Sequence, residues 1–169
     1  MVLQLDAGIH ILLQMMKILV LFGVSQEVLE VMNEYKFEDI KLNMTEEFYV
    51  EVTQKMQEDF KTNIGDINPI HSDKEFAEEK GFSDILVFGM LTASFYSKLV
   101  GVYLPGRNAL FQECKDLMFH SPVFIGDILN IKGEVISIDE RFKRITIKAV
   151  IRNQNNKKVC SAKLIAGVI

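Results

Sequence analysis

Residues 65–71 read Gly-Asp-Ile-Asn-Pro-Ile-His, inside a longer run, FKTNIGDINPIHSDKEFA, that covers residues 60–77. This stretch sets an acid, Asp66, and an imidazole, His71, five positions apart in a loop that Pro69 stiffens. A water molecule held between the two side chains would have one partner to take a proton and another to orient it or to return one. That is the minimum equipment for adding water to a polarised double bond, or for removing it.

The composition indicates a single domain and argues against nucleic-acid binding. The chain has 169 residues, of which 49% are apolar and 25% charged, so a core of ordinary size can form. Its formal net charge of −4 does not provide the basic surface that nucleic acids require. Cys114 and Cys160 lie far apart without metal-ligand spacing, and we expect both to be reduced, in a cytoplasmic protein.

Residues 1–43 form an extension whose role the sequence leaves open. Residues 9–24 are nearly all apolar, but this run is short for a transmembrane helix and Lys17 interrupts it. No basic residue precedes the run, which argues against a secretory signal, and we expect no membrane contact. A second helix is expected over residues 25–35. The extension either packs on the domain or on a partner subunit, or lies upstream of the true start of the protein.

Downstream of the extension, short helices give way to strands. Residues 47–53 alternate as a half-buried strand does, Thr53 suits a helix N-cap, and Ser72 with Glu75 has the spacing of a capping box. Residues 89–102 carry one charge, so we expect a helix that is buried on all sides. Further strands are expected at residues 109–119, 128–138, 144–153 and 158–168. One buried helix inside a curled antiparallel sheet is an α+β fold.

The loop around Asp66 resembles the signature Gly-Asp-x-Asn-Pro-aliphatic-His of the MaoC-like, (R)-specific enoyl-CoA hydratase family. Further matches follow in family order: Gly89-Met90-Leu91, Leu104-Pro105-Gly106, Phe119, Pro122-Val123 and Gly126-Asp127. The resemblance spans residues 44–169 and implies a single hot-dog domain, in which a curved sheet wraps a long central helix. It also implies a homodimer, which fits the need to cover the sheet edge that one such domain leaves open.

The resemblance implies a role for each candidate site residue. Asp66 would take a proton from water, His71 would share that water, and the backbone N–H of Gly89 would stabilise the enolate-like thioester oxygen. Three further candidates would support them. The side-chain amide of Asn68 can hydrogen-bond to the backbone of its own loop, and Met90 is among the residues that could line an acyl tunnel. Ser97 stands where some relatives have a serine that hydrogen-bonds to the catalytic aspartate.

Two positions depart from the family pattern. Ile64 stands where relatives usually have serine, threonine or another small residue, and Phe88 where many have histidine or a small residue. The first change would remove a hydroxyl near Asp66. The second would reshape the pocket without removing the Gly89 N–H.

The leading hypothesis is reversible hydration of trans-2-enoyl-CoA to (R)-3-hydroxyacyl-CoA, with no metal and no cofactor. The same chemistry on acyl carrier protein is the nearest alternative, although Lys and Arg are only scattered near residues 98–115. A thioesterase is disfavoured because the hydratase motif is intact. A non-catalytic acyl-thioester-binding subunit stays open because of the two departures and the N-terminal extension.

Overall fold

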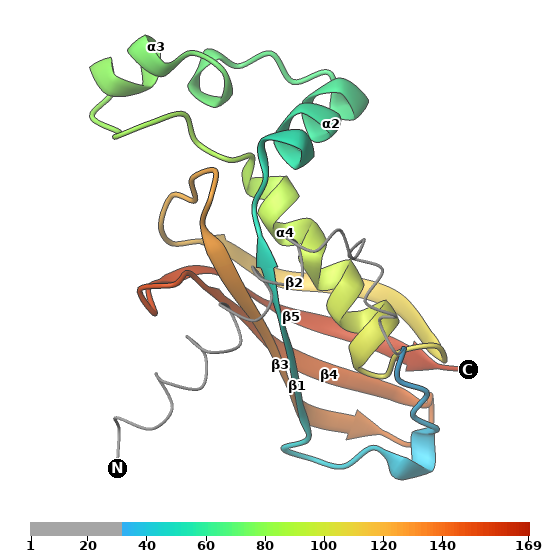
Figure 1. The fold of residues 1–169 in the computed structure, drawn as a ribbon. Coiled ribbons are helices and arrows are strands. Elements are labelled where there is room, and N and C mark those ends of the chain that lie inside the picture. The colour runs from blue at the N-terminus through green and yellow to red at the C-terminus, as the bar shows by residue number, and fades with distance from the viewer. Residues whose placement is uncertain (1–31) are drawn as a thin grey trace, which may run out of the picture. The chain divides into compact units, whose positions relative to one another are not determined.

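A five-stranded antiparallel sheet organises residues 32–169, the part of the chain that the computed structural model describes. The strands lie in the order β1-β3-β4-β5-β2 and cover Thr45–Glu51 (β1), Ala109–Phe119 (β2), Ile128–Asp139 (β3), Arg144–Arg152 (β4) and Lys158–Val168 (β5). Helix α4, Gly89–Lys98, lies across one face of the sheet, which curves around it (Figure 1). This is the hot-dog arrangement, and the prediction of an α+β hot-dog fold is confirmed.

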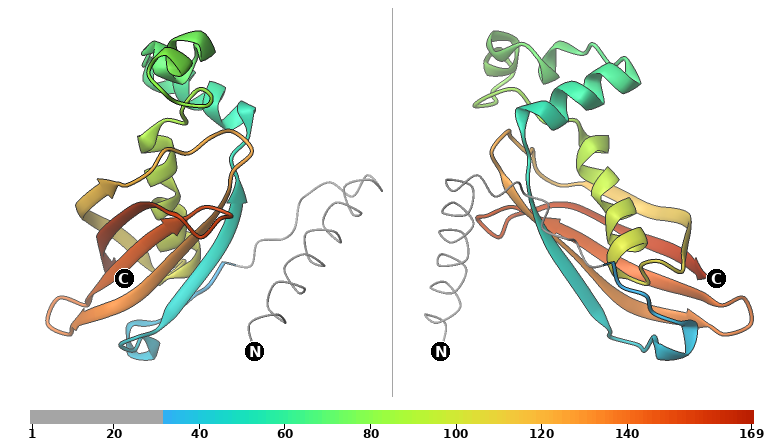
Figure 2. Two further views of the ribbon diagram at one scale, coloured as in Figure 1. Left: turned by 90° about the vertical axis from the view of Figure 1, so that its left-hand side faces the viewer. Right: turned by 45° about the vertical axis from the view of Figure 1, so that its right-hand side comes forward.

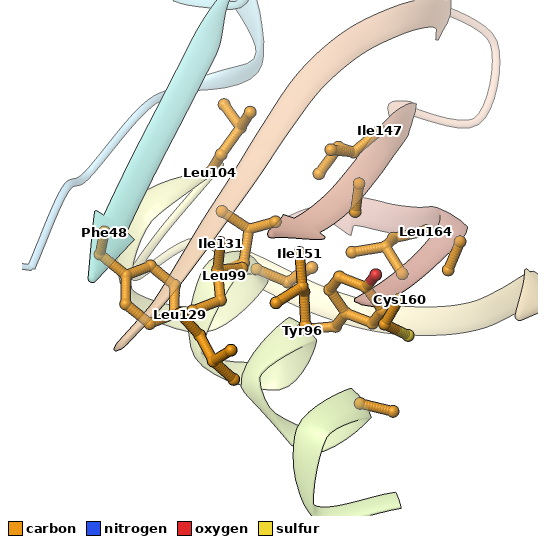
Figure 3. Packing of buried hydrophobic residues seen from close by; sticks show 14 of the residues in the cluster. Phe48, Tyr96, Leu99, Leu104, Leu129, Ile131, Ile147, Ile151, Cys160 and Leu164 are labelled. Atoms are coloured by element: carbon orange, nitrogen blue, oxygen red, sulfur yellow. The ribbon is translucent and has the colours of Figure 1, made fainter. Parts of the chain in front are cut away.

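Alternation along the strands builds the core between the sheet and the helical layer. The inward side chains of β4 are at most 1% exposed: Ile145, Ile147, Ala149 and Ile151. The register sets Ile147 opposite Leu164 of β5 and Val135 of β3, both fully buried. Tyr96 of α4 lies in the same cluster (Figure 3), and burial raises the pKa of its phenol well above the usual range. Burying each large apolar side chain stabilises the fold by roughly 1.5–3 kcal/mol.

The central helix changes its hydrogen-bond spacing near its C-terminal end. Helix α4 ends at Lys98 and continues as a π-helical turn, η3, Leu99–Tyr103, in which the Leu104 N–H donates to the Leu99 carbonyl at 2.8 Å. The expected stop at residues 104–106 is confirmed. The expectation of one regular helix over residues 89–102 misses the π turn, because an apolar run looks the same at either spacing.

Three short elements lie beyond the end of the sheet at which α4 begins (Figure 2): α2 (Gln54–Ile64), the 3-10 turn η2 (Pro69–His71) and α3 (Lys74–Glu79). The N-cap expected for α2 is confirmed, since Thr53 Oγ1 accepts from the Met56 N–H at 3.2 Å. Helix α3 begins one residue later than the capping box predicts. Its N-cap is Asp73, whose carboxylate accepts from the Phe76 N–H at 3.0 Å and takes the role expected of Ser72.

The segment that precedes β1 packs on the domain in an extended form. The Asn33 N–H donates to the Val102 carbonyl at 2.9 Å, and the Arg107 N–H donates to the Asn33 carbonyl at 2.8 Å. The helix expected over residues 25–35 is therefore wrong at residues 32–35, whose backbone bonds to the turn after η3 instead of along a helix. A 3-10 turn, Phe37–Asp39, follows and leads to the buried Ile40. The predictions for residues 1–31, including the apolar run, lie outside the described residues.

Within residues 32–169, every helix is too short or too polar to cross a membrane.

Candidate active site

A cleft of about 390 Å³ lies where the start of α4 meets the loop after α3 and the end of β2. Its volume is within the range of small-molecule sites, and most of its wall is apolar. The lining residues are His71, Phe82, Leu86, Val87, Gly89, Thr92, Phe119, His120, Ser121, Pro122, Val123 and Val159. Two of the predicted catalytic residues, His71 and Gly89, thus share one cleft although the sequence separates them by 18 positions.

The hydrogen bonds of His71 define which ring nitrogen can act as a base. Nδ1 lies 2.7 Å from the Leu86 carbonyl oxygen, and the half-buried ring packs on Phe88 with 4.1 Å between ring centroids. A carbonyl oxygen only accepts, so Nδ1 carries the hydrogen and, in the neutral ring, Nε2 keeps its lone pair. No described residue bonds to Nε2. The His71 ring therefore offers the cleft a proton acceptor.

The Gly89 N–H is a backbone donor without an acceptor among the described residues. Gly89 is the first residue of α4, where backbone N–H groups are unpaired and the helix dipole is positive. The ring of Phe119 packs against it so closely that a Cβ on residue 89 would lie 3.2 Å from two ring carbons. The absence of a side chain at residue 89 therefore leaves room for the Phe119 ring beside this donor. Such a donor can stabilise negative charge on a thioester oxygen.

Asp66 is exposed and is absent from the cleft lining in the described structure. Its Oδ1 accepts from the Asn68 N–H at 2.9 Å, and the Asn68 Oδ1 accepts from the Ile70 N–H at 3.2 Å. Through these two bonds Asn68 connects Asp66 to the backbone of Ile70 within the loop, as expected from the sequence. The described residues thus leave the Asp66 carboxylate open to solvent, outside the cleft that His71 and Gly89 share.

Three other residues singled out from the sequence lie on the surface. Met90 is 57% exposed and Ser97 is exposed, and neither lines the cleft. No hydrogen bond joins Ser97 to Asp66 in the described structure. Ile64, at the C-terminal end of α2, is 50% exposed, so the departure from a small residue puts an apolar side chain on the surface.

Gln57 is a buried site residue that the sequence reading missed. It is 2% exposed, and its amide bonds to the backbone of His71 and Leu86, which line the cleft, and of Phe88. Its signal in the sequence is a polar residue three positions before Phe60, on the apolar stripe of α2.

The cleft is also lined by a second histidine, His120, whose Nε2 lies 2.7 Å from Ser161 Oγ. Nowhere in residues 32–169 do three or more His, Cys, Asp or Glu side chains gather in a way that could hold a metal.

Comparison with known proteins identifies the relatives of this chain. The family model described as the MaoC like domain matches residues 36–157. The chain is 35% identical over 102 residues to a 3-hydroxybutyryl-CoA dehydratase of Methylorubrum extorquens, a match that covers 60% of this chain and 64% of the relative. It is 40% identical over 75 residues to an (R)-specific enoyl-CoA hydratase of Aeromonas caviae, covering 44% of this chain and 55% of the relative. Each match spans less than two thirds of the relative's length.

The fold has the same relatives. A solved (R)-hydratase from A. caviae involved in PHA biosynthesis superposes with a TM-score of 0.74 at 26% identity. The match covers 78% of this chain and 99% of that one, so nearly the whole of that structure has a counterpart here.

Proposed function

Because the chain belongs to the MaoC-like domain family, we propose that it catalyses the reversible hydration of trans-2-enoyl-CoA to (R)-3-hydroxyacyl-CoA. One observation carries this proposal: the Gly89 N–H and the His71 ring, both with unused hydrogen-bonding capacity, lie on the walls of one cleft. The relatives named as a dehydratase and a hydratase of CoA esters support the same reaction class. The (R) stereochemistry follows the A. caviae relative.

The proposed reaction needs three groups and one water molecule. The water is held between Asp66 and the Nε2 of His71, Asp66 takes a proton from it, and the hydroxide adds to C3 of the enoyl group. The C2=C3 electrons move toward the thioester oxygen, where the Gly89 N–H stabilises the charge. The proton is then delivered to C2, so one water is added and nothing else is consumed. Dehydration is the same sequence in reverse.

A homodimer would supply the enclosure that the exposed Asp66 lacks. Strand β2 pairs only with β5 among the described strands and presents a free edge. Apolar side chains are exposed on β2 and beside Asp66, with Ile67 81%, Met118 53% and Phe119 50% exposed. Open edges and apolar patches of this kind are surfaces that a second chain covers. Light scattering on the purified protein should give twice the mass of one chain, and a monomer at micromolar concentration would contradict the proposal.

Two basic residues that do not line the cleft, Arg107 and Lys115, bear on the choice between a coenzyme A ester and an acyl carrier protein, and we favour the coenzyme A ester. Arg107 and Lys115 are matched by acids, Glu34 at 3.8 Å and Glu113 at 2.8 Å, so they do not form the basic rim that an acidic carrier protein would need. We also place the protein in the cytoplasm, because neither cysteine of the described chain forms a disulfide.

Hydration of crotonyl-CoA tests the function directly. The ultraviolet absorbance of the enoyl thioester is followed with purified protein, first with crotonyl-CoA and then with longer 2-enoyl-CoA esters. We expect a saturable loss of absorbance and, on chiral analysis, the (R)-3-hydroxy product. A flat trace with every CoA ester, but turnover of 2-enoyl acyl carrier proteins, would move the substrate to the carrier protein. No turnover of either substrate would favour a binding subunit without catalysis.

A further inference from the structure

We propose that Gln57 is a positioning residue of the hydration site, which fixes the His71 ring and, at the same time, the Val87–Phe88 peptide that leads into α4. The inference rests on the proposed function, because it assigns Gln57 to the groups that would perform hydration. Gln57 would touch neither the substrate nor the water. It would act by holding His71 and Gly89 in place.

The Gln57 amide joins three backbone groups from two separate segments. Its Nε2 donates to the His71 carbonyl and to the Leu86 carbonyl, each at 3.1 Å. Its Oε1 accepts from the Phe88 N–H at 3.3 Å. With 2% of the residue exposed, water cannot replace these bonds. A single side chain of α2 thus connects the turn η2 to the chain that enters α4.

The first consequence concerns the orientation and tautomer of the His71 ring. The Leu86 carbonyl accepts from both the Gln57 Nε2 and the His71 Nδ1, the latter at 2.7 Å. Gln57 therefore fixes the acceptor that orients the ring and also holds the main chain of His71 itself. Groups that hold the hydrogen-bond acceptor of a functional histidine help to set the tautomer and the orientation of its ring in this way. Without Gln57, the Leu86 carbonyl is held less firmly, so the hydrogen on Nδ1 is less strongly favoured.

The second consequence concerns the direction of the Gly89 N–H. The three preceding N–H groups are each paired: Leu86 with the Ile70 carbonyl at 3.0 Å, Val87 with the Val123 carbonyl at 2.9 Å, and Phe88 with Gln57. The Gly89 N–H follows them and is the first without an acceptor in the described structure. Gln57 thus holds the last paired group before the free donor. A donor that is fixed before the reaction stabilises developing charge better than one that must reorient.

A purely structural Gln57 would give a different result from a positioning Gln57. Methionine has a similar length and volume but no hydrogen-bonding amide. Gln57→Met therefore leaves the His71 carbonyl and the Phe88 N–H unpaired, and leaves the Leu86 carbonyl with only the His71 Nδ1 as a donor. If Gln57 only stabilises the fold, the folded fraction of Gln57→Met keeps its turnover number. If Gln57 positions the site, the folded protein itself turns over more slowly, because small misplacements of reacting groups lower the rate steeply.

The first experiment compares the steady-state hydration kinetics of the full chain with those of Gln57→Met and Gln54→Met. Gln54 is the matched control, since it lies on the same helix, is exposed and bonds only to Glu58, at 2.8 Å. For Gln57→Met we expect kcat to fall about ten- to hundredfold with KM within about threefold. Gln54→Met should match the original protein. A kcat for Gln57→Met within about twofold of the original, with both variants folded by circular dichroism, would overturn the proposal.

The second experiment does not depend on turnover. The ¹⁵N chemical shifts of the His71 ring report its tautomer, and the original protein should show the single form with hydrogen on Nδ1. In Gln57→Met we expect a mixture of tautomers, while an unchanged single form would count against the positioning role. If Gln57→Met does not fold, Gln57→Glu keeps the length and the acceptor for Phe88 but loses the amide donors, and the same two outcomes apply. If the original protein hydrated no enoyl thioester, the proposed function would be wrong. The chemical shifts of the His71 ring would still show whether Gln57 positions that ring.

Discussion

Replacing Asp66 with asparagine is expected to lower kcat for enoyl-CoA hydration by about 10²- to 10⁴-fold, the usual contribution of a positioned general base. The carboxylate that would take the proton from water becomes an amide, which does not accept a proton at neutral pH. The fold should be unaffected, since Asp66 is exposed and, among the described residues, its side chain bonds only to the Asn68 N–H, from which it accepts. An asparagine Oδ1 can make that same bond.

A matched substitution separates the loss of the base from the loss of a surface charge. Asp59 is also exposed, lies on α2 and pairs with Lys55 at 2.7 Å, so Asp59→Asn removes one negative charge away from the loop. We expect Asp59→Asn to hydrate crotonyl-CoA at close to the original rate and to melt within a few degrees of the original protein. If Asp66→Asn retained a comparable rate, the assignment of Asp66 as the base would be wrong.

Much of the fold can be predicted from the sequence, because apolar and polar residues alternate along its strands and its turns contain typical turn residues. Strands β2 and β5 have the bounds that the pattern predicts, and Ile145, Ile147 and Ile151 are inward as their spacing requires. The conformation of residues 32–35 could not be predicted in this way. Their backbone hydrogen-bonds to residues about seventy positions away, at the turn after η3, and local helix propensity contains no information on such contacts.

The sequence predicts candidate site residues only where a short motif marks them. Asp66, Asn68 and His71 belong to one contiguous motif, and Gly89 begins the apolar run that predicts the central helix. Gln57 was not found, because its importance comes from the Leu86 and Phe88 backbone some thirty positions away. No pattern within a helix reveals that a buried amide is needed there. The shape of the cleft likewise depends on residues that approach one another only after β2 pairs with β5.

Replacing His71 with asparagine is the second change with a large expected effect, again about 10²- to 10⁴-fold in kcat. Asparagine places an N–H near the position of Nδ1, so the bond to the Leu86 carbonyl can be kept while the Nε2 lone pair is lost. The comparison is His120→Asn, which alters the other histidine of the same cleft and its contact with Ser161. We expect the smaller loss from His120→Asn, and the reverse order would assign the proton acceptor to His120.

The double variant Asp66→Asn, His71→Asn distinguishes one shared water from two independent contributions. If the side chains act separately, their fold-losses in kcat multiply. If both hold the same water, removing either one already disables the unit, and the second substitution adds little. We therefore expect the double variant to lose no more than about tenfold beyond the more severe single variant. Multiplied losses would leave both residues important, but they would exclude a mechanism in which a single water is bound between them.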